Sequence, residues 1–177
     1  RTSTARRIPL PIVRDGLAPY WTVFQVTIGE AMIGYAWGNA IALLLASTVL
    51  LLPRLETVVT QIAVVSYCLP VVAVGGIAIV VLGGAKRAGD PSATAIFLAA
   101  LAVFFTTVVG ALLGFKAADK AALDVVRVYG GSRFTQLRKV RLIAAAPAIL
   151  NALQIAVPSA FLGAILGEYM GAIDRGV

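Results

Sequence analysis

The chain contains no histidine and one cysteine, Cys68, and only 13% of its 177 residues are charged. Without histidine, and with a single cysteine, it has no residues for His-based acid–base chemistry, a Cys/His zinc site or an internal disulfide. A soluble domain carries about 25% charged residues. The low charge therefore argues against a soluble enzyme and against a nucleic-acid-binding tail. The phosphate-binding pattern GxxxxGK[ST] is also absent, so we expect no ATP site in this chain.

Apolar residues dominate instead. They make up 60% of the chain, the mean hydropathy is +0.94, and the formal net charge is +7. In so apolar a chain, excess Lys and Arg points to loops on the cytoplasmic side of a membrane. The chain begins with Arg1 and shows no signal-peptide pattern. We therefore expect a multi-span membrane protein, and we expect this sequence to be the core of a longer one.

Four apolar stretches are long enough to cross a hydrocarbon core of about 30 Å, which takes roughly 20 helical residues. They lack the alternation of barrel strands, so an all-α bundle is predicted. The predicted spans cover residues 21–52, 57–82, 93–115 and 142–167.

A basic segment, residues 116–141, separates the last two spans and holds seven of the 15 positive charges. The positive-inside tendency places it in the cytoplasm. Its periodicity predicts two short amphipathic helices, with Gly130-Gly131 ending the first and Ser132 capping the second. Two interpretations follow from the residues alone. The segment either anchors to anionic lipid headgroups or docks into a soluble partner.

Residues 124–147 contain a Gly-Gly-Ser-Arg core followed by Pro147. Three further motifs are Leu52-Pro-Arg-Leu-Glu56, Phe104-Phe105 and Gly167-Glu-Tyr-Met-Gly-Ala172. Together these motifs resemble those of ABC importer permeases, most closely the nitrate/sulfonate/taurine-type branch, and residues 124–147 are similar to the EAA loop of that family, with Pro147 at the family's offset. Two departures are visible: Asp124-Val125-Val126 stands for E-A-A, and Ile143 replaces a family proline.

The resemblance implies a type I importer permease fold, usually of six spans, of which this chain would supply the second to the fifth. It implies a multi-pass subunit of the bacterial inner membrane that lines the translocation path. It also implies coupling to a separate ATPase subunit, which would bind ATP and magnesium, and no cofactor in this chain. Further partners would be a second permease copy or a sister permease, and an external substrate-binding protein. The branch implies a small anionic substrate such as a sulfonate, taurine or nitrate. The residues expected to carry coupling are Asp124, Arg127, Gly130, Gly131, Ser132, Arg133 and Pro147.

Polar residues within the spans are costly and need an explanation. Glu30 could line the path, pair with another subunit or lie near the outer interface, and Glu168 is expected at that interface. For the uncharged residues, the alternative to a path is hydrogen bonding between helices. Gly29, Gly34 and Gly38 are expected to pack against another helix. The candidate path residues are Glu30, Ser66, Tyr67, Asn151, Gln154 and Ser159.

The competing hypothesis is an ATP-independent channel or secondary carrier whose basic loop only anchors to lipid. It predicts charged residues facing the pore in several spans, and Glu30 alone is a candidate. An intramembrane enzyme would need a cluster of His, Asp or Ser–Lys groups, which the spans lack.

Overall fold

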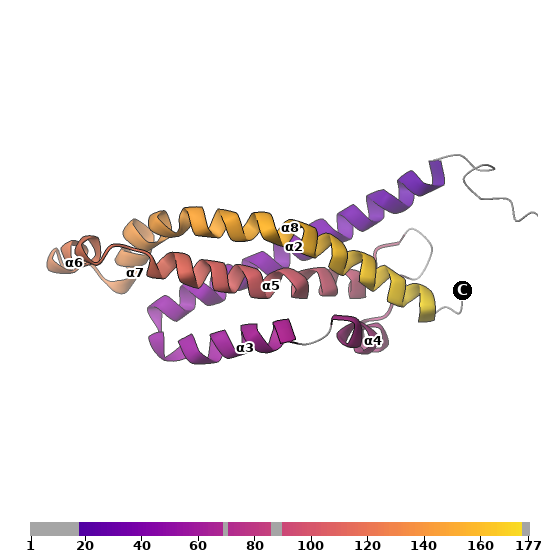
Figure 1. Ribbon diagram of the computed structural model, residues 1–177, viewed down its shortest axis with the longest axis horizontal. Helices are drawn as coiled ribbons and strands as arrows, with labels where there is room; N and C mark the ends of the chain where they lie inside the picture. The colour runs from indigo at the N-terminus through magenta and orange to yellow at the C-terminus, as the bar shows by residue number, and fades with distance from the viewer. Residues whose placement is uncertain (1–17, 69–70, 86–89, 175–177) are drawn as a thin grey trace, which may run out of the picture.

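The computed structural model describes residues 18–68, 71–85 and 90–174, and this described part contains helices and no strands (Figure 1). The predicted all-α class is thereby confirmed. A 3-10 turn occupies Pro53–Leu55 and a π-helical turn Leu137–Arg141. The α-helices are α2 (Ala18–Leu51), α3 (Glu56–Cys68), α4 (Val71–Leu82), α5 (Ala93–Lys116), α6 (Lys120–Val128), α7 (Arg133–Gln136) and α8 (Leu142–Asp174).

Three continuous helices are long and apolar enough to cross a membrane: Val23–Leu51, Ala93–Lys116 and Arg133–Gly171. The region predicted as one span over 57–82 differs. It forms two helices, Glu56–Ser66 and Val71–Leu82, whose axes form an angle of 92°. The sequence places Pro70 between them, and proline lacks an N–H and disfavours helical geometry in the preceding residue. Together the two helices could form a fourth, broken span.

The last span begins earlier than the sequence predicts. Residues 133–171 form one continuous helix of 39 residues, which includes α7, the π-helical turn and most of α8. The separate second helix expected inside the basic segment is therefore a wrong prediction. Its residues form the first turns of the last span, since no glycine or proline interrupts the chain between Ser132 and Pro147.

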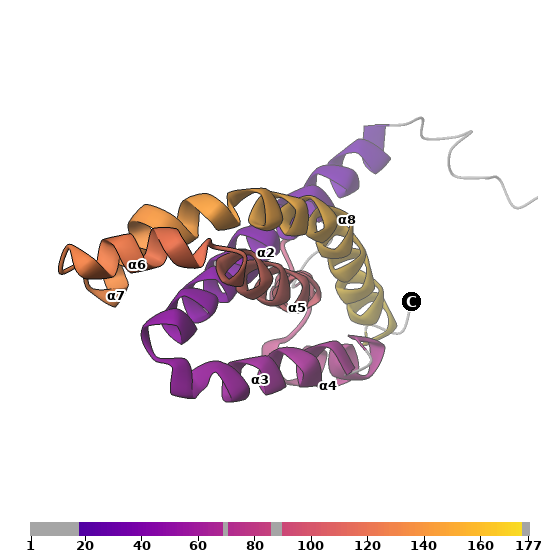
Figure 2. The same cartoon turned by 60° about the vertical axis from the view of Figure 1, so that its left-hand side comes forward.

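Helix α5 lies at the centre, packed between α2 and α8 (Figures 1 and 2). Small residues line the α5–α8 contact and let the two backbones approach closely, as is common between membrane helices. A Cβ atom added at Gly110 would lie 2.5 Å from the Cβ of Ala152. One added at Gly167 would lie 2.3 Å from the Cα of Ala95. The contact therefore requires glycine at both ends.

Two of the three predicted packing glycines on α2 also allow a close approach to α5. A Cβ at Gly34 would lie 2.5 Å from the Cβ of Ala99, and one at Gly38 would lie 2.5 Å from the carbonyl oxygen of Ala100. The predicted packing role of these two glycines is confirmed. Gly29 has open space around its Cα, so the same prediction for Gly29 is wrong.

Two hydrogen-bonded links also join α2 to its neighbours. The Thr107 hydroxyl of α5 donates to Asn39 Oδ1, and Asn39 Nδ2 donates to the carbonyl oxygen of Tyr35. The Tyr35 hydroxyl donates to the carbonyl oxygen of Leu153 on α8 over 3.1 Å. These links fix the register of α2 against α5 and α8.

Candidate functional site

Helix α6 projects from one end of the bundle and contributes no buried side chain (Figures 1 and 2). It begins after Asp119, whose carboxylate accepts a hydrogen bond from the N–H of Ala121, as N-cap residues do. Its apolar residues have little to pack against. The side chains of Val128 and Tyr129 are 84% and 87% exposed. The end of α6 therefore presents an uncovered apolar surface on a helix of nine residues.

The turn after α6 is built by glycines. The N–H of Gly131 donates to the carbonyl oxygen of Val126 over 2.8 Å, and the N–H of Gly130 donates to that of Arg127. This pair of bonds is a Schellman motif, and Gly130 has the positive φ, 76°, that the motif requires. Gly131 is needed for space, since a Cβ there would lie 2.4 Å from Cγ1 of Val126. The predicted helix end at Gly130-Gly131 is confirmed, with a positive φ at Gly130 and not at Gly131.

Ser132 then starts the next helix, as predicted. Its hydroxyl accepts a hydrogen bond from the N–H of Thr135 over 3.3 Å. Asp124 and Arg127 lie on α6 as an exposed ion pair, with 3.4 Å between Oδ1 and the guanidinium. Pro147 is not beside these residues, because it lies inside α8. Six of the seven predicted coupling residues thus lie in one segment, which runs from α6 through the turn to the first residue of α7.

Basic side chains tie the base of this segment to the bundle. Arg133 donates to the carbonyl oxygen of Leu51, and Arg141 donates to that of Phe115. These acceptors lie in the last turns of α2 and α5, where carbonyl oxygens lack helical partners and the helix dipole favours a cation. Lys116 pairs with Glu56 at the start of α3. The base is held on three helices, while α6 itself is left uncovered.

A small pocket lies where α3 and α4 separate. Its volume is about 280 Å³, and its polar lining comes from Ser66 and Ser159. Each hydroxyl donates to a carbonyl oxygen four residues earlier in its own helix, which leaves the oxygen lone pairs able to accept. The rest of the lining is apolar and includes Phe105. Two predicted path residues, far apart in the sequence, therefore share one pocket.

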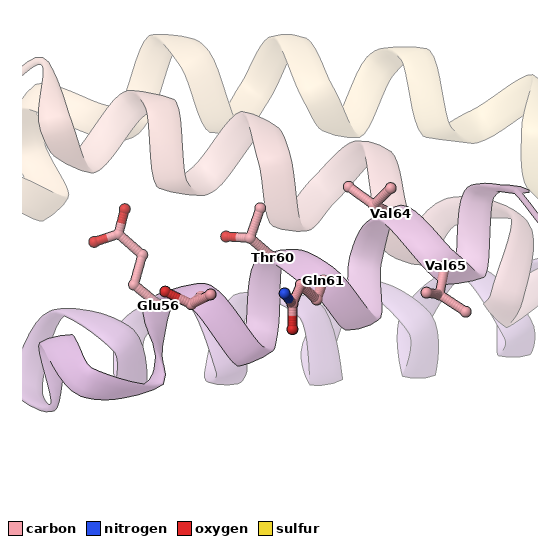
Figure 3. A pocket seen from close by; sticks show the side chains of 6 residues that line it. Glu56, Thr60, Gln61, Val64 and Val65 are labelled. Carbon is pink, nitrogen blue, oxygen red and sulfur yellow. The ribbon is translucent and has the colours of Figure 1, made fainter.

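A second hollow of about 740 Å³ follows α3 away from the break. Figure 3 shows Glu56, Thr60 and Gln61 along one stretch of the helix, followed by Val64 and Val65. Thr57 completes the lining. Polar side chains in membrane helices face protein or a watery cavity rather than lipid. Thr57, Thr60 and Gln61 are not among the predicted path residues. Their i, i+3, i+4 spacing on α3 is nevertheless visible in the sequence.

The remaining path candidates lie elsewhere. Asn151 and Gln154 are exposed on α8, and the side chain of Tyr67 lies outside the described residues. Glu30 is buried, with 1% of its surface exposed. Within the described residues, the hydroxyls of Ser66 and Ser159 donate within their own helices.

Comparison with known proteins agrees with this architecture. The profile of the family described as "Binding-protein-dependent transport system inner membrane component" matches residues 38–175. A probable ABC transporter permease protein of Haemophilus influenzae is 30% identical over 154 residues, which are 87% of this chain and 60% of that protein. The formylaminopyrimidine transport permease protein ThiX of Halalkalibacterium halodurans is 25% identical over 153 residues, 86% of this chain and 59% of that protein.

The chain thus spans about 60% of the length of the curated relatives it matches. No solved structure matches it significantly. The family match covers more than three quarters of the chain, including the uncovered helix, the glycine turn and the broken helix pair. The chain belongs to the family of binding-protein-dependent transport system inner membrane components.

Proposed function

We propose that this chain is the core of the permease subunit of an ATP-driven ABC importer in a bacterial inner membrane. It docks on a separate ATPase subunit through the coupling segment, which we define as residues 116–141. The observation that carries the proposal is α6, a nine-residue helix without a buried side chain. So short a helix is marginal in water on its own. Its exposed Val128 and Tyr129 suit insertion into an apolar groove of a partner, the helix-in-groove mode.

The arrangement of charge favours docking over lipid anchoring. Four of the seven cationic side chains in the coupling segment already bind acceptors of this chain. Lys116 and Arg127 pair with carboxylates, and Arg133 and Arg141 donate to helix-end carbonyl oxygens. An electrostatic lipid anchor depends on several free Lys and Arg side chains, each contributing about 1 kcal/mol at the membrane surface. The channel or carrier hypothesis has no other structural support, since Glu30, its only candidate pore charge, is buried.

The proposed path follows α3. The polar hollow along Thr57, Thr60 and Gln61 and the pocket with Ser66 and Ser159 lie one after the other on the same helix. In this proposal the second permease, a copy or a sister subunit, faces these hollows. An external binding protein delivers the substrate at the end of the bundle opposite α6, and ATP with magnesium acts on the partner ATPase.

The substrate has two candidates. The resemblance to the nitrate/sulfonate/taurine branch favours a small anion. A second candidate rests on the pocket of about 280 Å³, whose lining contains two hydroxyls and apolar side chains but no ionisable group. Such a lining suits an uncharged ring compound, and one relative is named for formylaminopyrimidine transport. Uptake of labelled taurine, competed separately by nitrate and by formylaminopyrimidine, would separate the two candidates in cells carrying the whole transporter.

The docking proposal is tested by co-purifying the full-length permease with its ATPase subunit in mild detergent. Val128→Asp with Tyr129→Asp should abolish co-purification and transport while membrane insertion stays normal. The matched control, Lys120→Gln with Lys139→Gln, removes charge from the same segment and should retain the ATPase. The opposite pattern, in which the charge variant loses activity and vesicle binding while the apolar variant transports normally, would establish lipid anchoring instead.

A further inference from the structure

The carboxyl group of Glu30 is the most enclosed ionisable group in the described part of the chain. It lies on α2, towards the end of the bundle opposite α6, with 1% of the residue exposed. One oxygen, Oε1, accepts a hydrogen bond from the backbone N–H of Ser92, which is the N-cap residue of α5. The other oxygen, Oε2, is buried and has no hydrogen-bond partner among the described residues. A buried carboxylate oxygen without a partner is costly, so this atom needs an explanation.

A second carboxyl, that of Glu168 on α8, lies beside the same face of α2. Thr27, one helical turn before Glu30 and on the same face, donates to Glu168 Oε1 over 2.7 Å. Gly167 lies directly against Ala95 in the first turn of α5. The carboxyl groups of two helices are therefore held together beside the start of a third.

No cation among the described residues offsets this pair. The ion pairs of the described part involve Glu56 with Lys116 and Asp124 with Arg127, both elsewhere. Among the elements packed against α2, the turn before α5 adds the exposed Asp90, and α8 adds Asp174, whose side chain lies outside the described residues. Lys86 and Arg87, in the connection before α5, lie outside the described residues.

We propose that Glu30 and Glu168 together bind one proton, with Oε2 of Glu30 donating to the carboxylate of Glu168. Two adjacent carboxylates in a medium of low polarity cannot both be ionised. A shared proton removes one negative charge and supplies the donor that Oε2 lacks. A metal ion fits less well, because Ca²⁺ takes six to eight oxygen ligands. Beyond the two carboxyl groups, the site offers only the hydroxyl of Thr27, which already donates to Glu168.

The proton joins α2 to α8 next to the N-terminus of α5. Without it, two negative charges would face each other between the helices. The proton belongs to the pair rather than to either residue. This proposal is independent of the coupling segment, which lies at the other end of the bundle.

The test is infrared spectroscopy of the full-length permease in lipid nanodiscs, with ¹³C-labelled glutamate assigning the bands. At neutral pH we expect the carbonyl stretch of a protonated glutamate, and Glu30→Gln should lose it. Glu56→Gln is the matched control and should keep the band, because Glu56 forms an exposed ion pair with Lys116. Absence of the band in the wild type at neutral pH, or its persistence in both Glu30→Gln and Glu168→Gln, would overturn the proposal.

Thermal unfolding gives a second readout. A glutamine amide can donate to Glu168 as the protonated acid does, so Glu30→Gln should keep the wild-type Tm at neutral pH, whereas Glu30→Ala should lower it. Two results would contradict shared protonation. One is a Tm of Glu30→Gln as low as that of Glu30→Ala. The other is an infrared band of protonated glutamate that appears only after Lys86 and Arg87 are replaced, which would show that these cations pair with the carboxylates in the wild type.

Discussion

The guanidinium of Arg133 reaches from the first turn of α7 to the carbonyl oxygen of Leu51, the last residue of α2, over 3.4 Å. The contact links the end of the first described span to the start of the last one. It is exposed and long for a hydrogen bond, so it contributes little to the free energy of unfolding. Its main effect is on position, because it sets where the coupling segment leaves the bundle.

Arg133→Ala should therefore reduce transport more than it reduces stability. We expect a loss of less than about 1 kcal/mol in the free energy of unfolding and a several-fold loss of transport-coupled ATP hydrolysis. Arg133→Lys keeps a cation near the end of α2 and should retain part of the coupling. A variant whose Tm falls sharply while coupling per folded molecule is unchanged would show that the contact is only structural.

Gly130 and Gly131 should fail for different reasons when substituted. Gly130 has open space but a φ of 76°, so Gly130→Asn should be tolerated and Gly130→Val should lose transport. For an ordinary L-residue the left-handed conformation costs about 1–2 kcal/mol. Gly131→Ala places a methyl group against Val126 and should also lose transport, and Val126→Ala should partly restore it. Transport assays, with membrane insertion measured as the control, show whether backbone strain at Gly130 and a steric clash at Gly131 cause the two losses.

Two glycines on spanning helices form a matched pair. Gly167→Ala should disrupt the α5–α8 contact, because its Cβ would lie 2.3 Å from the Cα of Ala95. Gly29→Ala has open space and should be neutral, or stabilising by up to about 1 kcal/mol through helix propensity. Thermal unfolding in detergent measures both. Equal destabilisation by the two substitutions would contradict the packing described for α5 and α8.

Removing one partner of the buried Asn39–Thr107 hydrogen bond should destabilise the protein more than replacing both partners by apolar residues. Thr107→Val removes the donor and leaves a buried amide oxygen unpaired, at a cost of about 1–3 kcal/mol. The double variant Thr107→Val with Asn39→Leu should be less destabilised than Thr107→Val alone. Unfolding measurements on both single variants and the double variant complete the cycle. A double variant less stable than either single variant would show that the two side chains act separately.

The features that the sequence predicted correctly are those that depend on local chemistry. The Schellman turn at Gly130 and the cap at Ser132 depend on residues within a few positions of one another, so their pattern is visible in the chain itself. The limits of the spans expected over 21–52 and 93–115 follow from runs of apolar residues. The continuity of residues 133–171 was missed because the change from charged to apolar residues at Arg141 resembles a boundary, although the helix does not end there.

Contacts between distant residues could not be predicted in this way. Nothing near Glu30 in the sequence indicates that its partners are Ser92 and Glu168. Ser66 and Ser159 were singled out separately, and only the fold places them on one pocket. Asn39 was overlooked because a single amide in an apolar helix gives no periodic signal, and its role depends on Thr107 of another helix.

The unbroken helix over residues 133–171 has a mechanical consequence. With a rise of about 1.5 Å per residue, the path along this curved helix from Arg133 to Glu168 is about 52 Å long (Figure 2). A tilt of about 5° around its Arg133 end would displace the Glu168 end sideways by up to about 5 Å. A small rotation at the coupling segment would therefore cause a larger displacement at the opposite end of the bundle. The length of the helix alone produces this increase, and the displacement is comparable with the pitch of an α-helix.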